Sequence, residues 1–319
     1  MKKTNALLIA INNSPIWANN VIEAFGDKHN LRIYNAELPL AEQFKDIEMV
    51  IDNGVFHDRT IIDAADGVKL WQVLSTGIDH TDVDHIKSKG IVVANCPGQL
   101  SGSSLAECAM MFILMLTRHF HDLTDDFQNQ ILWSTFGRSL DGLSLGLIGF
   151  GASGRELAKR AKVFGLKIKV IEVGDIPEDV LHEIKPDFVG GPDDMDKVIA
   201  ESDILSLHLP LIKETRHIID ARRLALMKPD AYLINVARGA LVDEDALYKM
   251  LLEGKLGGAG LDAFSDEPPN PEREVYKLHN VICTPHIAGV SNGIARLRAH
   301  HALKNADNFA QGLEAISQV

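Results

Sequence analysis

Cysteine is scarce in this 319-residue chain. The three cysteines, Cys96, Cys108 and Cys283, lie far apart and form no C-x-x-C pair. This spacing fits neither a disulfide framework nor a zinc knuckle. We therefore expect the protein to work in a reducing compartment, the cytoplasm.

Long apolar runs and basic runs are missing as well. The longest apolar run, Ala109 to Leu116, is far shorter than the roughly 20 residues that a membrane helix needs. The N-terminal run Ala6 to Ile11 is too short for a signal peptide and is followed by no cleavage site. A net charge of −12 without a basic cluster argues against nucleic acid binding. We expect neither a membrane nor a nucleic acid as a partner.

The sequence lacks the motifs of two kinds of site. No glycine-rich loop ends in Gly-Lys-Ser or Gly-Lys-Thr, which excludes phosphoryl transfer by a P-loop. The histidine pairs His119/His121 and His300/His301 lack zinc-motif spacing, so we expect no metal site. We expect His300 and His301 to lie on a solvated helix face.

The rest of the chain alternates short apolar runs with amphipathic stretches, which is typical of parallel α/β sheets. Apolar and charged contents of 46% and 24% describe a globular protein, and the length suggests two domains. We expect strands at 6–11, 31–34, 49–52, 71–74, 91–94, 145–148, 167–173, around 188, and at 204–208, 232–235, 258–261 and 281–284. We expect helices at 17–25, 108–117, 155–164, 195–201, 220–227, 244–253 and from 291 onward. We expect Ser104 and Glu107 to form a capping box, residues 175–196 to be largely irregular, and the tail helix to fold back on the first domain.

A dinucleotide fingerprint lies at the centre of this pattern. Gly149-Phe150-Gly151-Ala152-Ser153-Gly154 follows one expected strand and opens a helix, as the fingerprint requires. The first glycine permits a tight turn, the second lets the backbone approach a pyrophosphate, and the third lets the helix pack on the strand. Glu172 ends the next strand, where a carboxylate meets ribose hydroxyls. The sequence therefore predicts a nucleotide domain.

Three polar residues follow late strands: Arg238, Glu267 and His286. In a parallel sheet they converge on one edge. Arginine can bind a carboxylate bidentately, and histidine can give a proton to a carbonyl oxygen near neutral pH. Taken singly, the three residues also fit a surface ion pair, a solvated loop and a buried histidine.

Together these motifs resemble the D-isomer specific 2-hydroxyacid dehydrogenase family. The matching segments are 76–79, 95–98, 106–107, 149–154, 203–210, 214–217, 227–229, 235–239 and 284–289. The resemblance implies two Rossmann-like, doubly wound parallel-sheet domains of class α/β. A flavodoxin-like substrate domain is expected at 1–101 and 290–319, and an NAD-binding domain at 102–289, with the active cleft at the hinge.

The family also implies residue roles. Arg238 would bind the substrate carboxylate and carbonyl, His286 would be the acid/base, and Glu267 would be its partner. Substrate contacts are implied for Thr76, Gly77, Arg238 and His286. Cofactor contacts are implied for Gly149, Gly151, Ala152, Ser153, Gly154, Glu172, His208, Pro210, Ser104, Val236, Asp262 and His286. NAD is expected over NADP because Glu172 would repel a 2′-phosphate.

The reaction implied is hydride transfer between nicotinamide and a D-2-hydroxy acid or 2-oxo acid, in a homodimer paired through the NAD domains. Two alternatives stay open: a formate dehydrogenase-like enzyme, against which Glu267 argues, and an NADH-sensing corepressor-like binding protein. The substrate also stays open. Its side chain would be contacted from 53–56, 76–78 and 99–100, with His57 and Arg59 nearby, and no converging cations are evident there.

Overall fold

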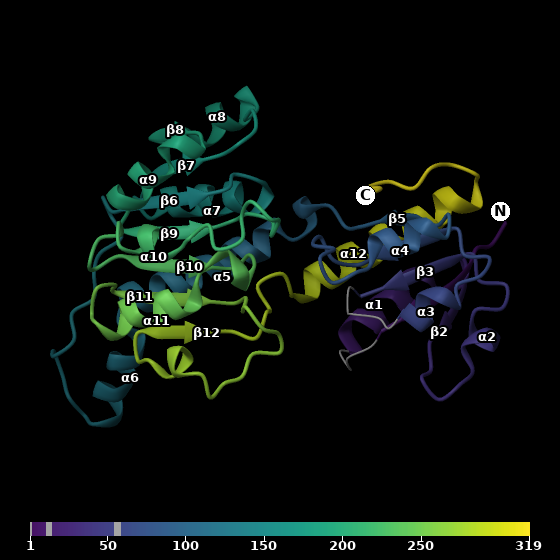
Figure 1. Ribbon diagram of the computed structural model, residues 1–319, viewed down its shortest axis with the longest axis horizontal. Helices are drawn as coiled ribbons and strands as arrows, with labels where there is room; N and C mark the ends of the chain where they lie inside the picture. The colour runs from purple at the N-terminus through teal and green to yellow at the C-terminus, as the bar shows by residue number, and fades with distance from the viewer. Residues whose placement is uncertain (1, 11–14, 54–58) are drawn as a thin grey trace. The chain divides into compact units, whose positions relative to one another are not determined.

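The computed structural model describes residues 2–10, 15–53 and 59–319 of the chain. The contacts divide it into two compact units, one of Met1–Leu100 with Val290–Val319 and one of Ser101–Gly289. Each unit contains a single sheet in which all paired strands are parallel (Figure 1). The expected α/β class with two parallel sheets is confirmed.

The first unit is flavodoxin-like, because its strands follow the order β2-β1-β3-β4-β5. These strands are β1 (Asn5–Ile9), β2 (Asn30–Ile33), β3 (Met49–Asp52), β4 (Leu70–Val73) and β5 (Val92–Ala94). The helices are α1 (Pro15–Phe25), α2 (Leu40–Gln43), α3 (Arg59–Asp63), α4 (Val83–Ser88) and α12 (Asn292–Ala310), with a 3-10 turn η1 (Gly98–Leu100). One core joins α1 and α12 to the sheet, and another joins α3 and α4 to it. The sheet is therefore covered on both faces.

The second unit has the strand order β12-β11-β10-β9-β6-β7-β8. Its strands are β6 (Ser144–Ile148), β7 (Lys167–Ile171), β8 (Phe188–Gly190), β9 (Ile204–Leu207), β10 (Tyr232–Asn235), β11 (Gly258–Leu261) and β12 (Val281–Cys283). The helices are α5 (Gly102–Thr117), α6 (Phe120–Gln128), α7 (Ala152–Val163), α8 (Glu178–Ile184), α9 (Met195–Glu201), α10 (Ala221–Leu224) and α11 (Glu244–Leu252), with 3-10 turns η2 (Pro192–Asp194), η3 (Gly239–Leu241) and η4 (Glu274–Lys277). The order reverses between β6 and β9, and a doubly wound sheet binds ligands outside the carboxyl ends of its strands at this point.

Apolar continuity explains the central strands. Strands β6, β9, β10 and β11 are buried at every position, as expected for parallel strands covered by helices on both faces. α5 and α7 pack on one face of the sheet, where Phe112, Ile113 and Leu157 are buried. α9 and α11 pack on the other face, where Ile199, Leu247 and Leu251 are buried.

Two local expectations were wrong. Ser104 and Glu107 form no capping box, because α5 begins at Gly102 and its N-cap is Ser101. Ser103, one position earlier, donates a hydrogen bond from its hydroxyl to Glu107. The stretch 175–196 is also less irregular than expected, since it includes α8, whereas β8 lies where a strand was expected around 188. The exposed polar face of α8 hid its helical pattern.

The tail helix packs on the first unit, as expected. α12 begins after the N-cap Ser291, whose hydroxyl accepts a hydrogen bond from Ile294 N. Farther along, Asn305 Nδ2 donates to Gln72 Oε1 at 2.6 Å, and Thr4 Oγ1 donates to the Ala306 carbonyl at 3.1 Å. These buried bonds join the last helix to β4 and to the residue before β1, which are distant from it in the chain.

The histidine pair of this helix was only partly predicted. His300 is exposed, as expected. His301 was expected on the same solvated face, but it is half-buried and donates a hydrogen bond to the Asn95 carbonyl, because α12 packs on the first unit.

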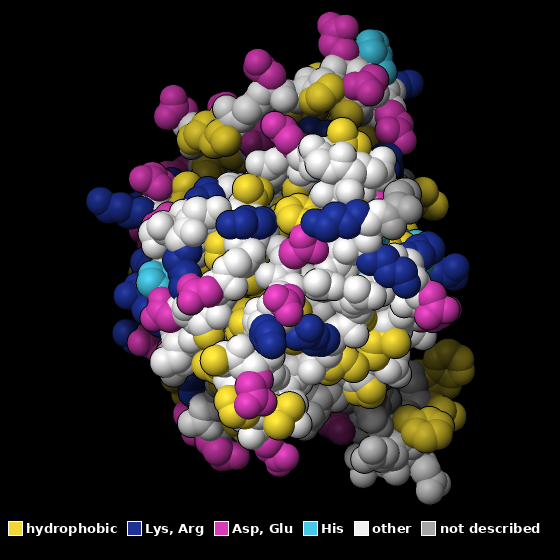
Figure 2. All heavy atoms as spheres, turned by 90° about the vertical axis from the view of Figure 1, so that its right-hand side faces the viewer, with side chains coloured by type: hydrophobic (Ala, Val, Ile, Leu, Met, Phe, Trp, Pro, Cys, Tyr) yellow, Lys and Arg dark blue, Asp and Glu magenta, His cyan; other side chains and the backbone are white. Residues whose placement is uncertain are grey.

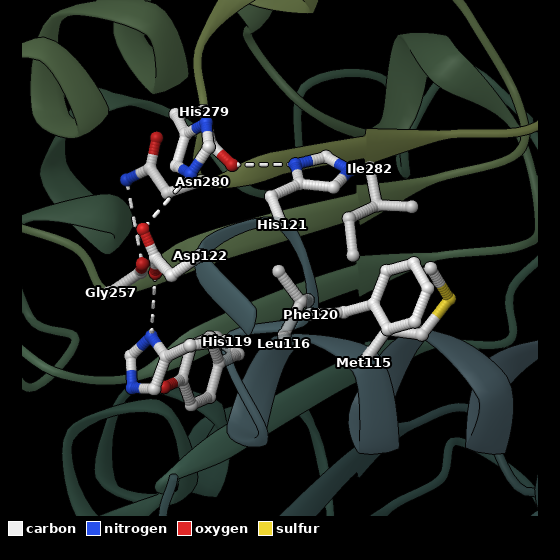
Figure 3. A pocket seen from close by; sticks show the side chains of 11 residues that line it. Met115, Leu116, His119, Phe120, His121, Asp122, Gly257, His279, Asn280 and Ile282 are labelled. Atoms are coloured by element: carbon white, nitrogen blue, oxygen red, sulfur yellow. Dashed lines mark hydrogen bonds and ion pairs between the residues drawn. The ribbon is translucent and has the colours of Figure 1, made fainter. Parts of the chain in front are cut away.

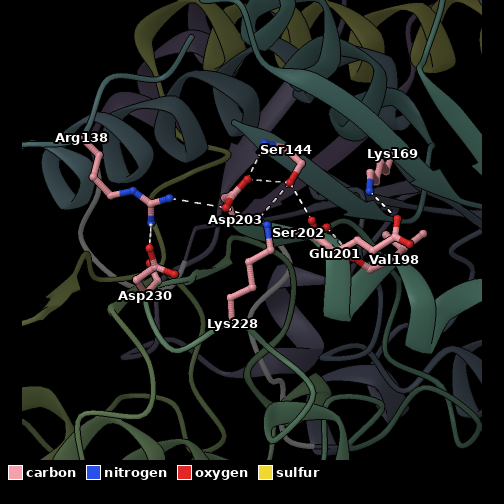
Figure 4. A network of polar contacts seen from close by, with 9 residues as sticks. All are labelled: Arg138, Ser144, Lys169, Val198, Glu201, Ser202, Asp203, Lys228 and Asp230. Atoms are coloured by element: carbon pink, nitrogen blue, oxygen red, sulfur yellow. Dashed lines mark hydrogen bonds and ion pairs between the residues drawn. The ribbon is translucent and has the colours of Figure 1, made fainter. Parts of the chain in front are cut away.

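A polar network fastens the amino edge of the seven-stranded sheet (Figure 4). Asp203, which precedes β9, accepts hydrogen bonds from Lys228 Nζ and from the backbone and hydroxyl of Ser144, all within 2.8 Å. Arg138 lies 3.4 Å from the same carboxylate and 3.0 Å from Asp230. Burial raises the pKa of Asp203, but the hydrogen bonds to Lys228 and Ser144 outweigh burial and bring it to about 2. The network is structural, because it lies at the edge opposite the ligand-binding one.

The surface has mixed charge. In Figure 2, Lys and Arg side chains are interspersed with Asp and Glu over the face in view. Across the described parts of the chain, no helix has the length and apolarity to cross a bilayer. The same residues contain no group of three or more His, Cys, Asp or Glu placed to bind a metal.

All three cysteines are free thiols. Burial raises the pKa of Cys96 and of Cys108 to about 12, so both are protonated at neutral pH. The cytoplasmic location stays a prediction.

Candidate active site

The glycine turn between β6 and α7 depends on the missing side chains of its glycines. Gly149 has φ of +93°, and a Cβ there would lie 2.5 Å from the His208 carbonyl oxygen. A Cβ on Gly154 would lie 2.6 Å from the Gly149 carbonyl oxygen, whereas one on Gly151 would meet no atom within 4 Å. Gly149 and Gly154 therefore serve the packing of the turn, and Gly151 faces open space.

This turn fits the pyrophosphate of a dinucleotide. α7 starts at Ala152 with Gly151 as its N-cap, and no side chain of the described residues caps it. Its first amides, on Ala152, Ser153 and Gly154, therefore face the open space above Gly151. Uncapped amides and the helix dipole together attract an anion.

Glu172 lies directly after β7, beside the same turn. Its Oε2 accepts a hydrogen bond from Phe150 N at 2.6 Å, and its Oε1 accepts one from Val173 N at 2.8 Å. The carboxylate thus joins the end of β7 to the fingerprint loop. Its position at the carboxyl end of this strand was predicted from the sequence. Its contact with a ribose stays a prediction.

A hydrogen-bonded chain lies behind the glycine turn. His208 Nδ1 is 2.9 Å from Ser153 Oγ, and its Nε2 is 3.0 Å from Ser206 Oγ. Burial lowers the pKa of His208 to about 4, so the ring is neutral at pH 7. A neutral ring donates at one nitrogen and accepts at the other, which fixes the directions of the two hydroxyls. His208 therefore orients Ser153 in the first turn of α7.

Arg238 follows β10 in a tight loop. Asn235 holds this loop, because its side chain donates to the Arg238 carbonyl at 2.9 Å and accepts from Ala237 N at 3.1 Å. Gly239 lies against the loop after β11, where a Cβ would come within 1.8 Å of the Phe264 carbonyl carbon. The loops after β10 and β11 are thus packed backbone to backbone, with the half-buried Arg238 at their edge.

His286 and Glu267 form a direct pair. His286 Nδ1 lies 2.8 Å from both carboxylate oxygens of Glu267, and Phe264 N donates to Glu267 Oε1 at 3.1 Å. The hydrogen bond to Glu267 raises the pKa of His286, while burial and the nearby charge of Arg238 lower it, with a net increase. Nδ1 is occupied by the carboxylate, so Nε2 is the nitrogen that can exchange a proton with a ligand.

Asp262 holds the loop that carries His286. Its buried carboxylate accepts hydrogen bonds from Thr284 Oγ1 at 2.6 Å and from Ile287 N and Ala288 N, each at 2.8 Å. His286 itself has φ of +53°, a left-handed conformation that is costly for a residue with a Cβ. The bonds to Asp262 on both sides of His286 stabilise that conformation. The predicted contact of Asp262 with nicotinamide stays a prediction.

The remaining predicted residues are spread over both units. Val236 is buried directly after β10, Pro210 is exposed in the loop after β9, and Ser104 is half-buried inside α5. Thr76 and Gly77 belong to the first unit, where they follow β4. Of the loops predicted to contact the substrate side chain, residues 54–56 and His57 lie outside the described residues.

A separate pocket lies at the opposite edge of the seven-stranded sheet (Figure 3). There His279 Nε2 lies 2.9 Å from Asp122 Oδ1, and His121 Nδ1 lies 2.9 Å from the His279 carbonyl. His119 approaches the same aspartate at 3.7 Å. These bonds join α6 to the turn before β12. The pocket is distant along the strands from Arg238 and His286, so it is not the active site.

Comparison with known proteins agrees with this geometry. Residues 110–288 match the model of the D-isomer specific 2-hydroxyacid dehydrogenase family, NAD binding domain. The chain belongs to this family. The dehydrogenase is 38% identical over 265 residues to a glyoxylate reductase of Thermococcus litoralis, covering 80% of this chain and 78% of the relative. It is 38% identical over 281 residues to a hydroxypyruvate reductase of Thermotoga maritima, covering 85% and 88%.

A solved structure extends the likeness to nearly the whole chain. The D-lactate dehydrogenase of Aquifex aeolicus, crystallised with NAD and lactic acid, matches with a TM-score of 0.80 and 31% identity, covering 97% of this chain and 96% of the other. The NAD-binding part of the dehydrogenase is thus the unit that contains the fingerprint turn.

The sequence did not reveal two parts of this site. The contacts of Asp262 come from a loop more than 20 residues later, and no local pattern announces them. The pairing of Ser153 with His208 joins residues that were each predicted to lie near the cofactor, but not to touch.

The glycine geometry separates cofactor binding from folding. In Gly151→Ala, we expect an unchanged thermal midpoint but at least roughly tenfold weaker NADH binding, because the methyl group meets no protein atom within 4 Å and enters the space where we expect the pyrophosphate. In Gly154→Ala, we expect a lower midpoint as well, since the methyl group meets backbone. Fluorescence titration of NADH and thermal unfolding measure both. Wild-type NADH affinity in Gly151→Ala would contradict the assignment.

The pKa of His286 tests its pairing with Glu267. In Glu267→Gln, the imidazolium loses its carboxylate partner, so we expect the pKa of His286 to fall. An NMR pH titration of the ring nitrogens measures it without any substrate. Asp266→Asn, a change at the exposed neighbour, is the control and leaves the titration unchanged. An equal shift in both variants would refute a specific pair.

Proposed function

We propose that this dehydrogenase interconverts a D-2-hydroxy acid and its 2-oxo acid with NAD, using Arg238, Glu267 and His286 as catalytic residues. The observation that carries the proposal is the His286–Glu267 pair with the charge of Arg238 beside it. Bound nicotinamide supplies or accepts the hydride. The protein must then bind the carboxylate of the substrate and transfer one proton.

His286 is suited to move that proton. With Nδ1 bonded to Glu267, Nε2 can donate a proton to the carbonyl oxygen during reduction and remove it from the hydroxyl during oxidation. The raised pKa keeps a larger fraction of His286 protonated near neutral pH. Reduction therefore weakens as pH rises through this pKa, and oxidation weakens as pH falls through it.

Arg238 is suited to hold the substrate. A guanidinium binds a carboxylate through two parallel hydrogen bonds and polarises the adjacent carbonyl. In a net acidic protein, the substrate anion depends on such local donors. Thr76 and Gly77 would add contacts from the first unit.

NAD is the cofactor that fits the turn after β6. Glu172 lies directly after β7 and beside the fingerprint turn, so we propose that its carboxylate meets the ribose and disfavours the 2′-phosphate of NADP. The names of the relatives, glyoxylate, hydroxypyruvate and D-lactate enzymes, support a small 2-oxo acid as substrate.

We also propose a homodimer paired through the NAD-binding units. α6 and the segment after it project from the sheet (Figure 1) and expose Phe127, Leu132, Trp133 and Phe136, each at least 77% exposed. On the same unit, α5 and α7 form an apolar hollow that includes Met111, Leu114, Met115 and Phe164. Apolar surface of this extent marks an interface. Two such surfaces on one unit suit a twofold pair in which the projecting segment of one copy fills the hollow of the other.

The reaction is tested by NADH oxidation at 340 nm with a panel of 2-oxo acids. We expect turnover that falls roughly 100-fold or more in kcat/KM in Arg238→Gln, because substrate orientation and carbonyl polarisation are both lost. Arg222→Gln is the control. It removes an exposed guanidinium of α10 that is hydrogen-bonded to Asp196 of α9. Tight NADH binding without turnover on any 2-oxo acid would favour a sensor protein over an enzyme.

The dimer is tested at Trp133. A charge there would be desolvated in the interface, so we expect Trp133→Glu to shift the protein from dimer to monomer in light scattering after gel filtration. Leu252→Glu, at another exposed apolar side chain on α11, leaves the mass unchanged. A monomeric wild type would refute the proposal.

A further inference from the structure

Glu244 is a buried acid that the proposed reaction does not use directly. It is the first residue of α11, and its side chain is 5% exposed. Its Oε1 accepts a hydrogen bond from Ser265 N at 2.8 Å, and its Oε2 accepts from Arg273 Nη1 at 2.6 Å and from the Tyr276 hydroxyl at 2.9 Å. Acidic side chains are almost never buried this deeply unless they are paired. Three donors and the amino end of a helix hold this carboxylate in one place.

The two oxygens of Glu244 bind different segments of the second unit. Oε2 binds the segment before β12, because Tyr276 belongs to η4 and Arg273 is the N-cap of that turn. Burial and the negative charge of Glu244 raise the pKa of Tyr276, so its hydroxyl stays protonated and donates. This half of the contact joins α11 to η4. Oε1 binds the loop after β11 through Ser265.

Ser265 lies two residues before Glu267 in the loop after β11. In this loop, Phe264 N donates to Glu267 Oε1 at 3.1 Å, and the carboxylate of Glu267 lies 2.8 Å from His286 Nδ1. The bond from Ser265 N to Glu244 fixes the next amide along the chain. Two successive amides of one short loop are thus held by two carboxylates. A displacement of Ser265 therefore moves Glu267 relative to the imidazole.

The peptide group that Glu244 holds also touches the loop that carries Arg238. A Cβ on Gly239, the next residue, would lie 1.8 Å from the Phe264 carbonyl carbon and 2.3 Å from Ser265 N, so the two loops are in direct backbone contact. The chain of the first loop then continues to Glu244, at the start of α11. The bond between Glu244 and Ser265 therefore fastens the loop after β10 to the loop after β11.

We propose that Glu244 is a positioning residue, which holds Glu267 against His286 and keeps the adjoining loop of Arg238 in place. This inference rests on the proposed function, in which these three residues are catalytic. The charges that dominate the pKa of His286 are those of Glu267, Arg238 and Asp262. An effect of Glu244 on the imidazole is therefore transmitted by the loop after β11, because Glu244 contacts that loop and not the imidazole.

The main test is Glu244→Gln. An amide accepts hydrogen bonds at its oxygen only, so it cannot replace both carboxylate oxygens. We expect Glu267 to move away from the imidazole and the pKa of His286 to fall, as in Glu267→Gln. An NMR pH titration of the ring nitrogens measures this pKa without any substrate. We also expect kcat/KM to fall roughly 10- to 100-fold, since a displacement of about 1 Å can cost about 100-fold. Reduction should then weaken at a lower pH than in the wild type.

Two variants in the same cluster separate positioning from stability. Arg273→Met removes a partner of Oε2 and leaves the bond to Ser265 N, so we expect a lower thermal midpoint with an unchanged pKa of His286. Asp245→Asn, at an exposed acid that pairs with the same arginine, should change neither quantity. NADH affinity, measured by fluorescence titration, should stay at the wild-type value in Glu244→Gln, because the glycine turn after β6 is not touched.

A second substitution covers the case in which Glu244→Gln does not fold. Glu244→Asp keeps the negative charge, but its shorter side chain cannot reach both Ser265 N and Arg273, so we expect the pKa of His286 to fall here too. An unchanged pKa of His286 would overturn the proposal, whatever the turnover. An equal fall in Arg273→Met would also overturn it, since lost stability alone would then explain both. If the wild type turns over no 2-oxo acid, the proposed function fails, and the titration still decides whether Glu244 positions the pair.

Discussion

The common direction of the strands in the seven-stranded sheet is the constraint on which the site depends. Because every strand runs the same way, each loop that follows a strand is delivered to one edge. The fingerprint turn, Glu172 and His208 follow β6, β7 and β9, while Arg238, Glu267 and His286 follow β10, β11 and β12. The parallel topology thus brings together residues that lie more than 130 positions apart in the sequence. Only short loops of fixed shape are then needed to position their side chains.

Those loops are shaped by buried acids and by glycine. Asp262 stabilises the left-handed backbone at His286 through two amides of the same turn. Glu244, at the start of α11, accepts hydrogen bonds from Ser265 N, Arg273 and Tyr276, and so holds the loop that carries Glu267. His286 and Glu267 are therefore positioned by two buried carboxylates, those of Asp262 and Glu244. A substitution of Asp262 or Glu244 would affect catalysis by displacing the loops that carry His286 and Glu267.

Much of this arrangement was predictable, for a physical reason. Strands β3, β10 and β11 were predicted with their observed bounds, because each is a buried apolar run ended by a turn. The contact of Glu267 with His286 was also anticipated, because the family resemblance implied that the two residues are partners. Failures occurred where the deciding interaction is tertiary. α8 has a mostly exposed polar surface that gives no clear period, and the helix that was predicted to be capped at Ser104 has its N-cap at Ser101, three residues earlier.

Arg298 shows the limit of pattern reading most clearly. On the sequence alone it is one more basic residue of an amphipathic tail helix, and such residues are usually solvated. It is buried because α12 packs on α1, which brings the ring of Trp17 over its guanidinium. A protein with a net charge of −12 cannot attract an anionic substrate through its overall field. Its selectivity must therefore reside in a few desolvated cations, where each hydrogen bond to an anion is stronger than it would be in water. Arg238, half-buried in the loop after β10, is placed in this way.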